Sequence, residues 1–243
     1  MKPHHKENTI YTLLLVVVLG IIAIFAVNAA KGLDSMQPQT PKVSISTTYP
    51  EIISSPLAAL NINESDLTAC TSDPATSDII DTDISEAGAT GTPLFYIYSD
   101  KIAYKIVGAI PAEMFTGLLS AIEQGQDLPI PEDSKDNFQK VTFDDTNTFI
   151  KQNETDTPLR VDLKTPTVTI VEYGDLSCPA CKYAHSELKK TLTDSPKTQF
   201  IFRHHPLTSL HEFAYDQAKV AICLQKIAGP KIYWDFVDLS YRE

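Results

Sequence analysis

Basic residues, glycine and cysteine are all scarce in this chain. Lysine and arginine number 20 against 31 acidic residues, which gives a formal net charge of -11 over 243 residues. This balance argues against a nucleic-acid-binding surface, and no basic patch is present. The nine glycines form no Gly-rich phosphate-binding loop. No internal repeat is evident. The composition fits a soluble, exported domain.

The four cysteines match neither a zinc ribbon nor a haem attachment site. Two of them form Cys178-Pro179-Ala180-Cys181, whereas Cys70 and Cys223 stand alone, so a second pair of zinc ligands is missing. A c-type haem needs histidine directly after the second cysteine, and that residue here is Lys182. A disulfide within the motif would be a tight, reducible ring. The motif favours redox chemistry, with zinc and a purely structural disulfide as alternatives.

The position of the motif suits a reactive thiol. It follows the apolar run Val168 to Tyr173 and precedes a helical pattern, so it lies at a strand-to-helix turn. Pro179 is favourable at a first helical position, and the unpaired amides and dipole of a helix N-terminus stabilise a thiolate at Cys178. The pKa of such a cysteine can fall from about 8.5 to roughly 3.5–7.5. Cys181, one turn on, can then close the disulfide or release a mixed disulfide.

An uncharged apolar run of 18 residues, Ile10 to Val27, lies near the N-terminus. It has about the minimum length that spans a bilayer as a helix. Lys2 and Lys6 precede it, so the positive-inside tendency leaves the N-terminus in the cytoplasm and exports the rest. We predict a cytoplasmic tip and single-pass anchor over residues 1–30, in the lipid bilayer through residues 10–27. A signal peptide cleaved near Ala29 is the alternative, and either way the cysteines face an oxidising compartment.

Composition divides the remainder of the chain. Residues 31–56 are rich in Ser, Thr and Pro, which predicts an extended spacer. Residues 126–165 are acidic and polar and are interpreted as a linker, in which Val141-Thr142-Phe143 could form a short edge strand. Residues 57–125 and 166–243 carry strand and helix patterns. The exported part is long enough for one domain of moderate size or two small ones.

Both patterned segments resemble the DsbA family of exported thiol:disulfide oxidoreductases. Val168 to Cys181 is similar to that family's active-site segment, and Phe200 to Leu207 to its second strand and turn, before the start of its helical insertion. Upstream, residues 86–93, 94–107 and 111–125 resemble its cis-proline loop, closing hairpin and last helix. The resemblance implies an α/β, thioredoxin-like mixed sheet with a helical insertion, preceded here by one transmembrane helix. The second half of that fold, 57–125, comes before the first half, 166–243.

This reversed order leaves two interpretations open. In the first, the halves fold together as a permuted domain with a four-stranded sheet, because neither half makes a stable sheet alone. In the second, the chain is a truncated or rearranged product that would continue past Glu243. The resemblance places Cys70 and Cys223 in the helical insertion, where some family members have a structural disulfide. A bridge between them would support assembly, and two buried free thiols are the alternative.

The resemblance also implies roles for further residues. Pro93 would be a cis-proline that faces the cysteines and leaves the Thr92 backbone free to pair with an extended substrate, whereas a trans turn proline is the alternative. Glu172 would be buried under the active site, where a raised pKa could help move protons to or from Cys181. A solvent-facing Glu172 is the alternative. His185 could tune Cys181, although a helix-surface histidine is the simpler interpretation.

We therefore predict a membrane-anchored, extracytoplasmic thiol:disulfide oxidoreductase that exchanges a Cys178-Cys181 disulfide with the thiols of exported proteins, foremost as an oxidant. No cofactor and no metal is required, because the redox equivalents reside in the two sulfurs. The resemblance implies reoxidation by a membrane quinone-linked partner. A disulfide reductase or isomerase, a non-enzymatic peptide-binding module and a metal-delivery protein are the alternatives.

Overall fold

The computed structural model describes residues 49–60, 62–88, 91–128, 130, 132–142, 156–159 and 162–242. All of them lie in Val43–Glu243, one of the two units into which the chain divides. The predicted anchor over residues 10–27 lies outside the described residues and stays a prediction. Within the described ranges, no helix is long and apolar enough to cross a membrane.

The described elements are both helices and strands. In chain order they are α2 (Glu51–Ala58), α3 (Glu64–Thr71), α4 (Pro74–Ala87), β1 (Leu94–Tyr98), β2 (Ala103–Val107), α5 (Ala112–Gln124), the 3-10 helix η1 (Glu132–Asn137), β3 (Phe138–Val141), β4 (Val168–Gly174), α6 (Pro179–Thr193), β5 (Thr198–His204), α7 (Ala214–Ala228) and α8 (Pro230–Ser240).

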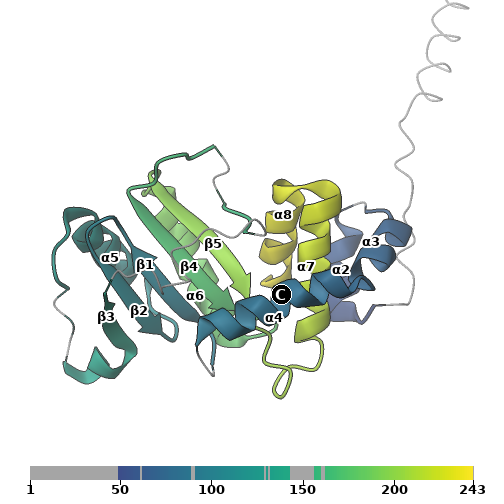
Figure 1. Ribbon diagram of the computed structural model, residues 1–243, viewed down its shortest axis with the longest axis horizontal. Coiled ribbons are helices and arrows are strands. Elements are labelled where there is room, and N and C mark those ends of the chain that lie inside the picture. The colour runs from purple at the N-terminus through teal and green to yellow at the C-terminus, as the bar shows by residue number, and fades with distance from the viewer. Residues whose placement is uncertain are drawn as a thin grey trace, which may run out of the picture. The chain divides into compact units, whose positions relative to one another are not determined.

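Both predicted halves contribute to one sheet with the strand order β3-β2-β1-β4-β5 (Figure 1). β4 and β5 run parallel, and the other neighbours are antiparallel. The join between the halves is the β1–β4 pair, in which Phe95 lies opposite Glu172. This is the arrangement of the permuted-domain interpretation, with five strands in place of the expected four.

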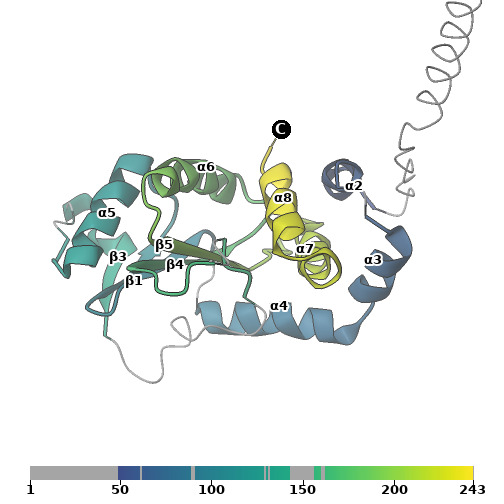
Figure 2. The same ribbon diagram turned by 90° about the horizontal axis from the view of Figure 1, so that it is seen from above.

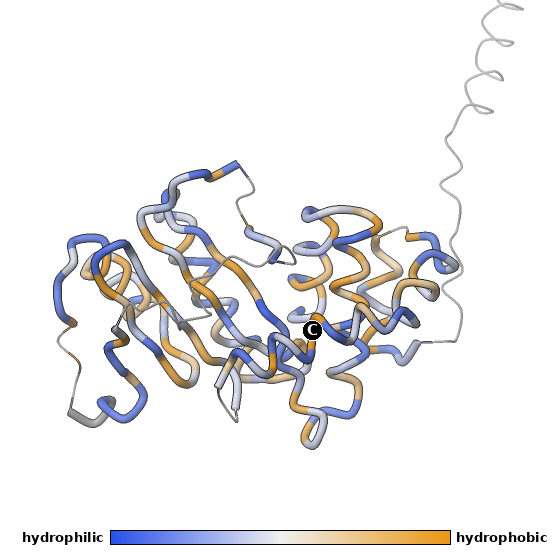
Figure 3. The backbone as a smooth tube through the Cα atoms, in the orientation of Figure 1, coloured by the Kyte–Doolittle hydropathy of each residue, from blue (hydrophilic) through white to orange (hydrophobic). Residues whose placement is uncertain are grey.

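Helices cover both faces of the sheet. α5 and α6 lie over one face and α4 crosses the other, while α2, α3, α7 and α8 gather beyond β5 (Figure 2). Successive residues of β4 alternate between these faces. Ile170 joins the large core under α6, whereas Val171 and Tyr173 pack with Ala87 of α4. Hydrophobic stretches of the chain alternate with hydrophilic ones in the described unit (Figure 3).

Two elements differ from the sequence-based expectations. The edge strand occupies Phe138–Val141 rather than residues 141–143, with Phe138 buried in the core under α5. The last residues of the predicted 31–56 spacer form α2, because Ile53 and Leu57 stand four residues apart and are buried on one helix face that packs against α8. The Ser and Pro residues between them concealed this apolar pair.

A disulfide joins the helical elements of the two halves. Cys70 at the end of α3 is bonded to Cys223 in α7 across 153 residues of sequence, with a Cα–Cα distance of 5.7 Å. This is the pairing that the resemblance implied. Such a bridge restricts the unfolded chain and typically contributes about 2–5 kcal/mol to the stability of a small domain.

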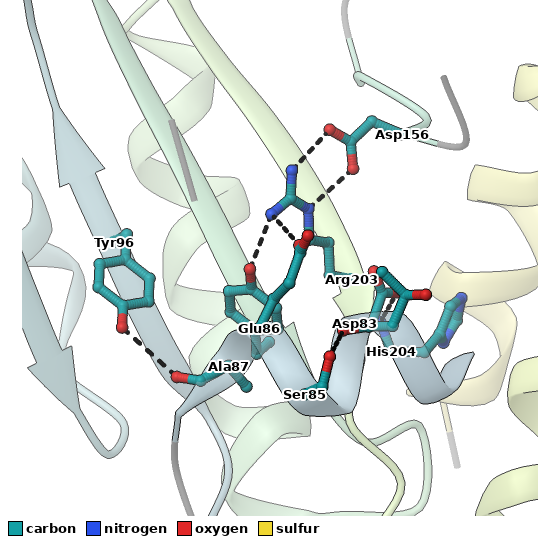
Figure 4. A network of polar contacts seen from close by, with 10 residues as sticks. Asp83, Ser85, Glu86, Ala87, Tyr96, Asp156, Arg203 and His204 are labelled. Carbon is teal, nitrogen blue, oxygen red and sulfur yellow. Dashed lines mark hydrogen bonds and ion pairs between the residues drawn. The ribbon is translucent and has the colours of Figure 1, made fainter. Parts of the chain in front are cut away.

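A buried polar network joins α4, β5 and the end of the predicted linker (Figure 4). The Arg203 guanidinium donates to both oxygens of Asp156 at 2.9 Å, to the Tyr173 hydroxyl at 2.7 Å and to Glu86 at 3.2 Å. Beside it, Asp83 accepts a 2.9 Å hydrogen bond from the His204 amide. Arg203 is only 1% exposed, so these partners compensate for the burial of its charge.

Candidate active site

Cys178 and Cys181 lie at the beginning of α6, directly after the β4 turn. Cys178 is the N-cap residue and Pro179 occupies the first turn, where its missing amide hydrogen costs nothing. The Cys178 amide donates to Asp175 O at 3.0 Å, and the Cys178 carbonyl accepts from the Lys182 amide at 3.0 Å. Both cysteines are free thiols, with Cys178 7% exposed and Cys181 fully buried. Only Cys178 therefore reaches the surface.

The structure lowers the pKa of the Cys178 thiol to about 5. The largest cause is the hydrogen bond from the Cys181 thiol, and the backbone amides of Cys181 and Ala180 add to it, while burial opposes the shift. A thiolate predominates at neutral pH, and the thiolate is the nucleophilic form of cysteine.

Cys181 is shifted in the opposite direction. Burial raises the pKa of the Cys181 thiol, and the hydrogen bond to Cys178 and the charge of Glu172 raise it further. The Asp175 amide donates to Cys181 Sγ at 3.5 Å. Cys181 is therefore a protonated, enclosed donor beside an ionised neighbour, which is the division of roles expected of an attacking and a resolving cysteine.

The predicted cis-proline loop faces Cys178 from the other half of the chain. The Thr92-Pro93 peptide bond is cis, as the resemblance implied. Cys178 Sγ lies 3.7 Å from Thr92 O, and Pro93 O accepts a 2.8 Å hydrogen bond from the Gly108 amide. The loop and the motif are thus brought together by the β1–β4 pairing.

Glu172 is buried on β4, on the face of the sheet that α6 covers. It is fully buried, and neither carboxyl oxygen has a hydrogen-bond partner within the described part of the chain. Burial raises the pKa of this carboxyl well above its usual range, and the charge of Cys178 adds to the effect. The solvent-facing alternative is wrong. Glu172 therefore keeps its proton to a higher pH than an exposed carboxyl does, close to the two sulfurs.

Gly174 is required by the close packing around this carboxyl. A Cβ atom at Gly174 would lie 2.5 Å from the Phe202 ring and 3.0 Å from Glu172 Oε1. Any larger residue would have to displace an aromatic side chain of the neighbouring strand. The Phe202 ring and the Glu172 carboxyl thus both lie close to Gly174 at the end of β4.

Asp175 organises the active-site turn and was missed in the sequence. Its Oδ1 accepts from the Ser177 amide at 2.7 Å, while its Oδ2 accepts from the Leu207 amide at 2.8 Å and lies 2.8 Å from His211 Nδ1. The carboxylate, 1% exposed, therefore ties the turn before Cys178 to the loop after β5. The Asp-Leu-Ser order is an Asx-turn signal that could have identified it.

α8 completes the site from the side. The Tyr241 hydroxyl donates to Asp175 O at 3.1 Å. His185 of α6 is 5% exposed, and its Nε2 lies 2.8 Å from Asp238 Oδ1. The surface position expected for His185 is wrong, because α8 packs over this turn of α6. The described residues contain no group of three His, Cys, Asp or Glu side chains arranged to hold a metal ion.

Comparison with known proteins supports the fold. A family profile described as thioredoxin matches residues 132–243. A Na(+)/H(+) antiporter named NhaA 1 from Salinispora arenicola (strain CNS-205) is 38% identical over 73 residues, which is 30% of this chain and 11% of the antiporter. NhaA 3 of Salinispora tropica (strain ATCC BAA-916 / DSM 44818 / JCM 13857 / NBRC 105044 / CNB-440) is 35% identical over 72 residues, again 30% of this chain and 11% of the relative.

The chain thus spans about a tenth of the length of these curated relatives. No solved structure matches the chain significantly. The mixed sheet, the helices on both faces and the matched profile together define a thioredoxin-like fold. The antiporter names belong to proteins of which only a small part is similar, so transport is not inferred for this chain.

Proposed function

We propose that this protein is a thiol:disulfide oxidoreductase that exchanges a Cys178-Cys181 disulfide with the thiols of exported proteins. The observation that carries the proposal is the opposite shift of two neighbouring thiols: the pKa of Cys178 is lowered to about 5 and that of Cys181 is raised. The Thr92 backbone beside Cys178 adds an edge on which an extended substrate can lie.

The reaction begins with the oxidised pair. A substrate thiolate attacks Cys178 Sγ, the Cys178–Cys181 bond breaks, and Cys181 leaves as a thiolate that takes up a proton. A second substrate thiolate then attacks the substrate sulfur of the mixed disulfide and releases Cys178 as a thiolate. The substrate loses two electrons and gains a disulfide, and the protein gains the two electrons as a dithiol.

Glu172 is the proposed proton donor to Cys181. Burial raises the pKa of Glu172, and the charge of Glu172 in turn raises the pKa of Cys181. Cys181 needs a proton when it leaves, since its own pKa is raised by burial. A carboxyl poised in this way suits general acid catalysis in one direction and general base catalysis in the other.

The proposed direction is oxidation of substrate. A strongly lowered thiol pKa stabilises the reduced form of the pair, which makes the disulfide form a better oxidant. The proposed setting is extracytoplasmic, with a membrane anchor over residues 10–27 and reoxidation by a membrane quinone-linked partner. The apolar run and the Cys70–Cys223 disulfide support this setting, because disulfides persist in oxidising compartments.

The test uses the oxidised full-length protein and a reduced peptide with two cysteines. We expect the peptide to be oxidised in stoichiometric amounts, with loss of the reaction in Cys178→Ser. Cys70→Ser/Cys223→Ser, which lacks only the other cysteines, is the matched control and retains it. A reduction potential near about -120 mV supports an oxidant, and one near about -270 mV a reductase. If the folded wild-type protein does not oxidise the peptide, the proposed enzymatic function is wrong and the non-enzymatic peptide-binding alternative remains.

A further inference from the structure

A basic cavity of about 280 Å³ lies between α6 and α8. Its lining includes Lys182 and Lys189 of α6 and Arg242 after α8, against one acidic side chain, Asp238. This concentration of positive charge contrasts with the formal net charge of -11 of the whole chain. A cavity of this sign attracts carboxylates locally even where the distant field of the protein repels them.

The acidic residue of the cavity is already committed to internal partners. Asp238 Oδ1 lies 2.8 Å from His185 Nε2, and Asp238 Oδ2 accepts from the Lys189 ammonium. Both oxygens of Asp238 are therefore engaged by residues that line the same cavity. The lining retains an excess of lysine and arginine over aspartate, so its net charge is positive.

The lining of the cavity begins one helical turn beyond the reactive cysteine. The Lys182 amide donates to Cys178 O at 3.0 Å, which places Lys182 one helical turn, about 6 Å of rise, beyond the nucleophile. Tyr241 also lines the cavity, and its hydroxyl donates to Asp175 O in the turn before Cys178 at 3.1 Å. A chain attached to Cys178 covers this distance in two or three extended residues, at about 3.3 Å each.

Arg242 also lines a neighbouring cavity of about 350 Å³, together with Ile52 and Glu51 of α2. Ile52 is 42% exposed there, whereas Glu51 brings an opposing charge. The excess of positive over negative charge is therefore greatest on the α6 side of Arg242, where Lys182 and Lys189 lie.

We propose that this cavity binds the carboxylate of an aspartate or glutamate that lies two or three residues from the reacting cysteine of a substrate polypeptide. The inference rests on the proposed function and names a class of substrate for it. Binding there orients the substrate while its thiolate attacks Cys178, so that acidic sequence around a cysteine accelerates exchange.

The experiment measures the second-order rate of exchange between the oxidised full-length protein and two single-cysteine peptides. One peptide carries glutamates two and three residues on either side of its cysteine, and its twin carries glutamines there. The negative net charge of the protein alone predicts that the glutamate peptide reacts more slowly. Binding in the cavity predicts that it reacts about three- to tenfold faster at low salt, with the advantage lost in about 0.5 M salt.

The variant Lys182→Gln/Arg242→Gln is expected to abolish the preference, so that the two peptides react at similar rates or the glutamate peptide is slower. Lys231→Gln, which removes one exposed positive charge from α8 outside the cavity, should retain it. Suppose that the glutamine peptide reacts. Binding in the cavity is then refuted if the wild-type protein does not prefer the glutamate peptide, or if the preference survives in the double variant. If neither peptide reacts, the proposed function fails, and this inference fails with it.

Discussion

Cys178 and Cys181 share one helical turn, but their surroundings give them opposite chemistry. Cys178 receives the Cys181 hydrogen bond and helix amides, which stabilise its negative charge. Cys181 donates that bond and is enclosed by β4 and α6, so ionisation would leave a second buried charge beside Glu172. The asymmetry therefore depends on the hydrogen bond between the thiols as much as on the helix N-terminus.

The first prediction is the pH profile of alkylation of the reduced protein. The rate with iodoacetamide should rise with pH with a midpoint at about 5, because the thiolate is the reactive form. Cys181→Ala should move the midpoint upward, since it removes the largest cause of the lowered pKa, whereas Cys181→Ser keeps a donor and should move it less. A midpoint near about 8.5 in the wild-type protein would contradict this account.

The second prediction concerns Glu172→Gln in the oxidised protein, where the paired cysteines do not titrate. Burial raises the pKa of Glu172 above its usual 4.5. Above this pH the unfolded chain releases the proton that the native state retains, so the wild type loses stability as pH rises. The variant has no such loss, so its stability relative to the wild type should increase with pH, by at most about 1.4 kcal/mol per pH unit.

Urea unfolding at about pH 5 and about pH 7 measures this difference. Glu113→Gln, which removes an exposed carboxylate from α5, is the matched control. A gap between Glu172→Gln and the wild type that does not change with pH would show that Glu172 is not held in its protonated form. Slower formation of the mixed disulfide in the same variant would add evidence for proton delivery to Cys181, because Cys181 leaves in that step.

The residues of the site differ in how far the sequence reveals them. The cysteine pair can be identified by its spacing, and Thr92, Pro93 and Glu172 were identified by the resemblance to the DsbA family. Asp175 is different, because its importance comes from Leu207 and His211, which belong to another loop. A carboxylate whose partners are remote in sequence carries only a weak local signal.

The strands also differ in how far the sequence reveals them. β1, β2, β4 and β5 were predictable because their apolar residues form short runs bounded by turn residues. β3 was displaced by three residues because Gln139 and Lys140 dilute its pattern, and its position is decided by pairing with β2. The pairing of Asp156 with Arg203 was not predictable, because an acidic linker contains many carboxylates and only packing selects one.

The third prediction tests whether Asp156 is the carboxylate that stabilises the buried Arg203. Asp156→Ala should lower the free energy of unfolding by about 2–4 kcal/mol, because it leaves the buried Arg203 guanidinium with fewer partners. Asp162→Ala, at an exposed position in the same stretch of sequence, should have little effect. Chemical denaturation of both variants measures the difference. Equal effects would mean that the charge of the linker, rather than the Arg203 contact, matters.

The two halves depend on each other throughout the described unit. The β1–β4 pair joins their strands, Cys70–Cys223 joins their helices, and the Thr92 carbonyl of one half lies against the Cys178 thiol of the other. The C-terminal half supplies only β4 and β5, and an isolated two-stranded piece is at best marginally stable in water, so this half depends on the strands of the other. The reversed order of the halves thus leaves the site intact, because the contacts between strands, rather than chain order, place the loop beside the cysteine.

The last prediction follows from this dependence. A protease site inserted within residues 145–153, outside the described residues, should allow cleavage into two pieces that remain together. On a denaturing, non-reducing gel the cleaved wild type should run as one species, held by Cys70–Cys223, and Cys70→Ser/Cys223→Ser as two. Under native conditions both should elute as one complex in gel filtration, because the β1–β4 pairing and the shared core persist. The low pKa of Cys178 should survive cleavage, as the midpoint of alkylation would show. Separation of the native pieces, with loss of that midpoint, would mean that the covalent connection is needed to keep the two halves of the sheet together.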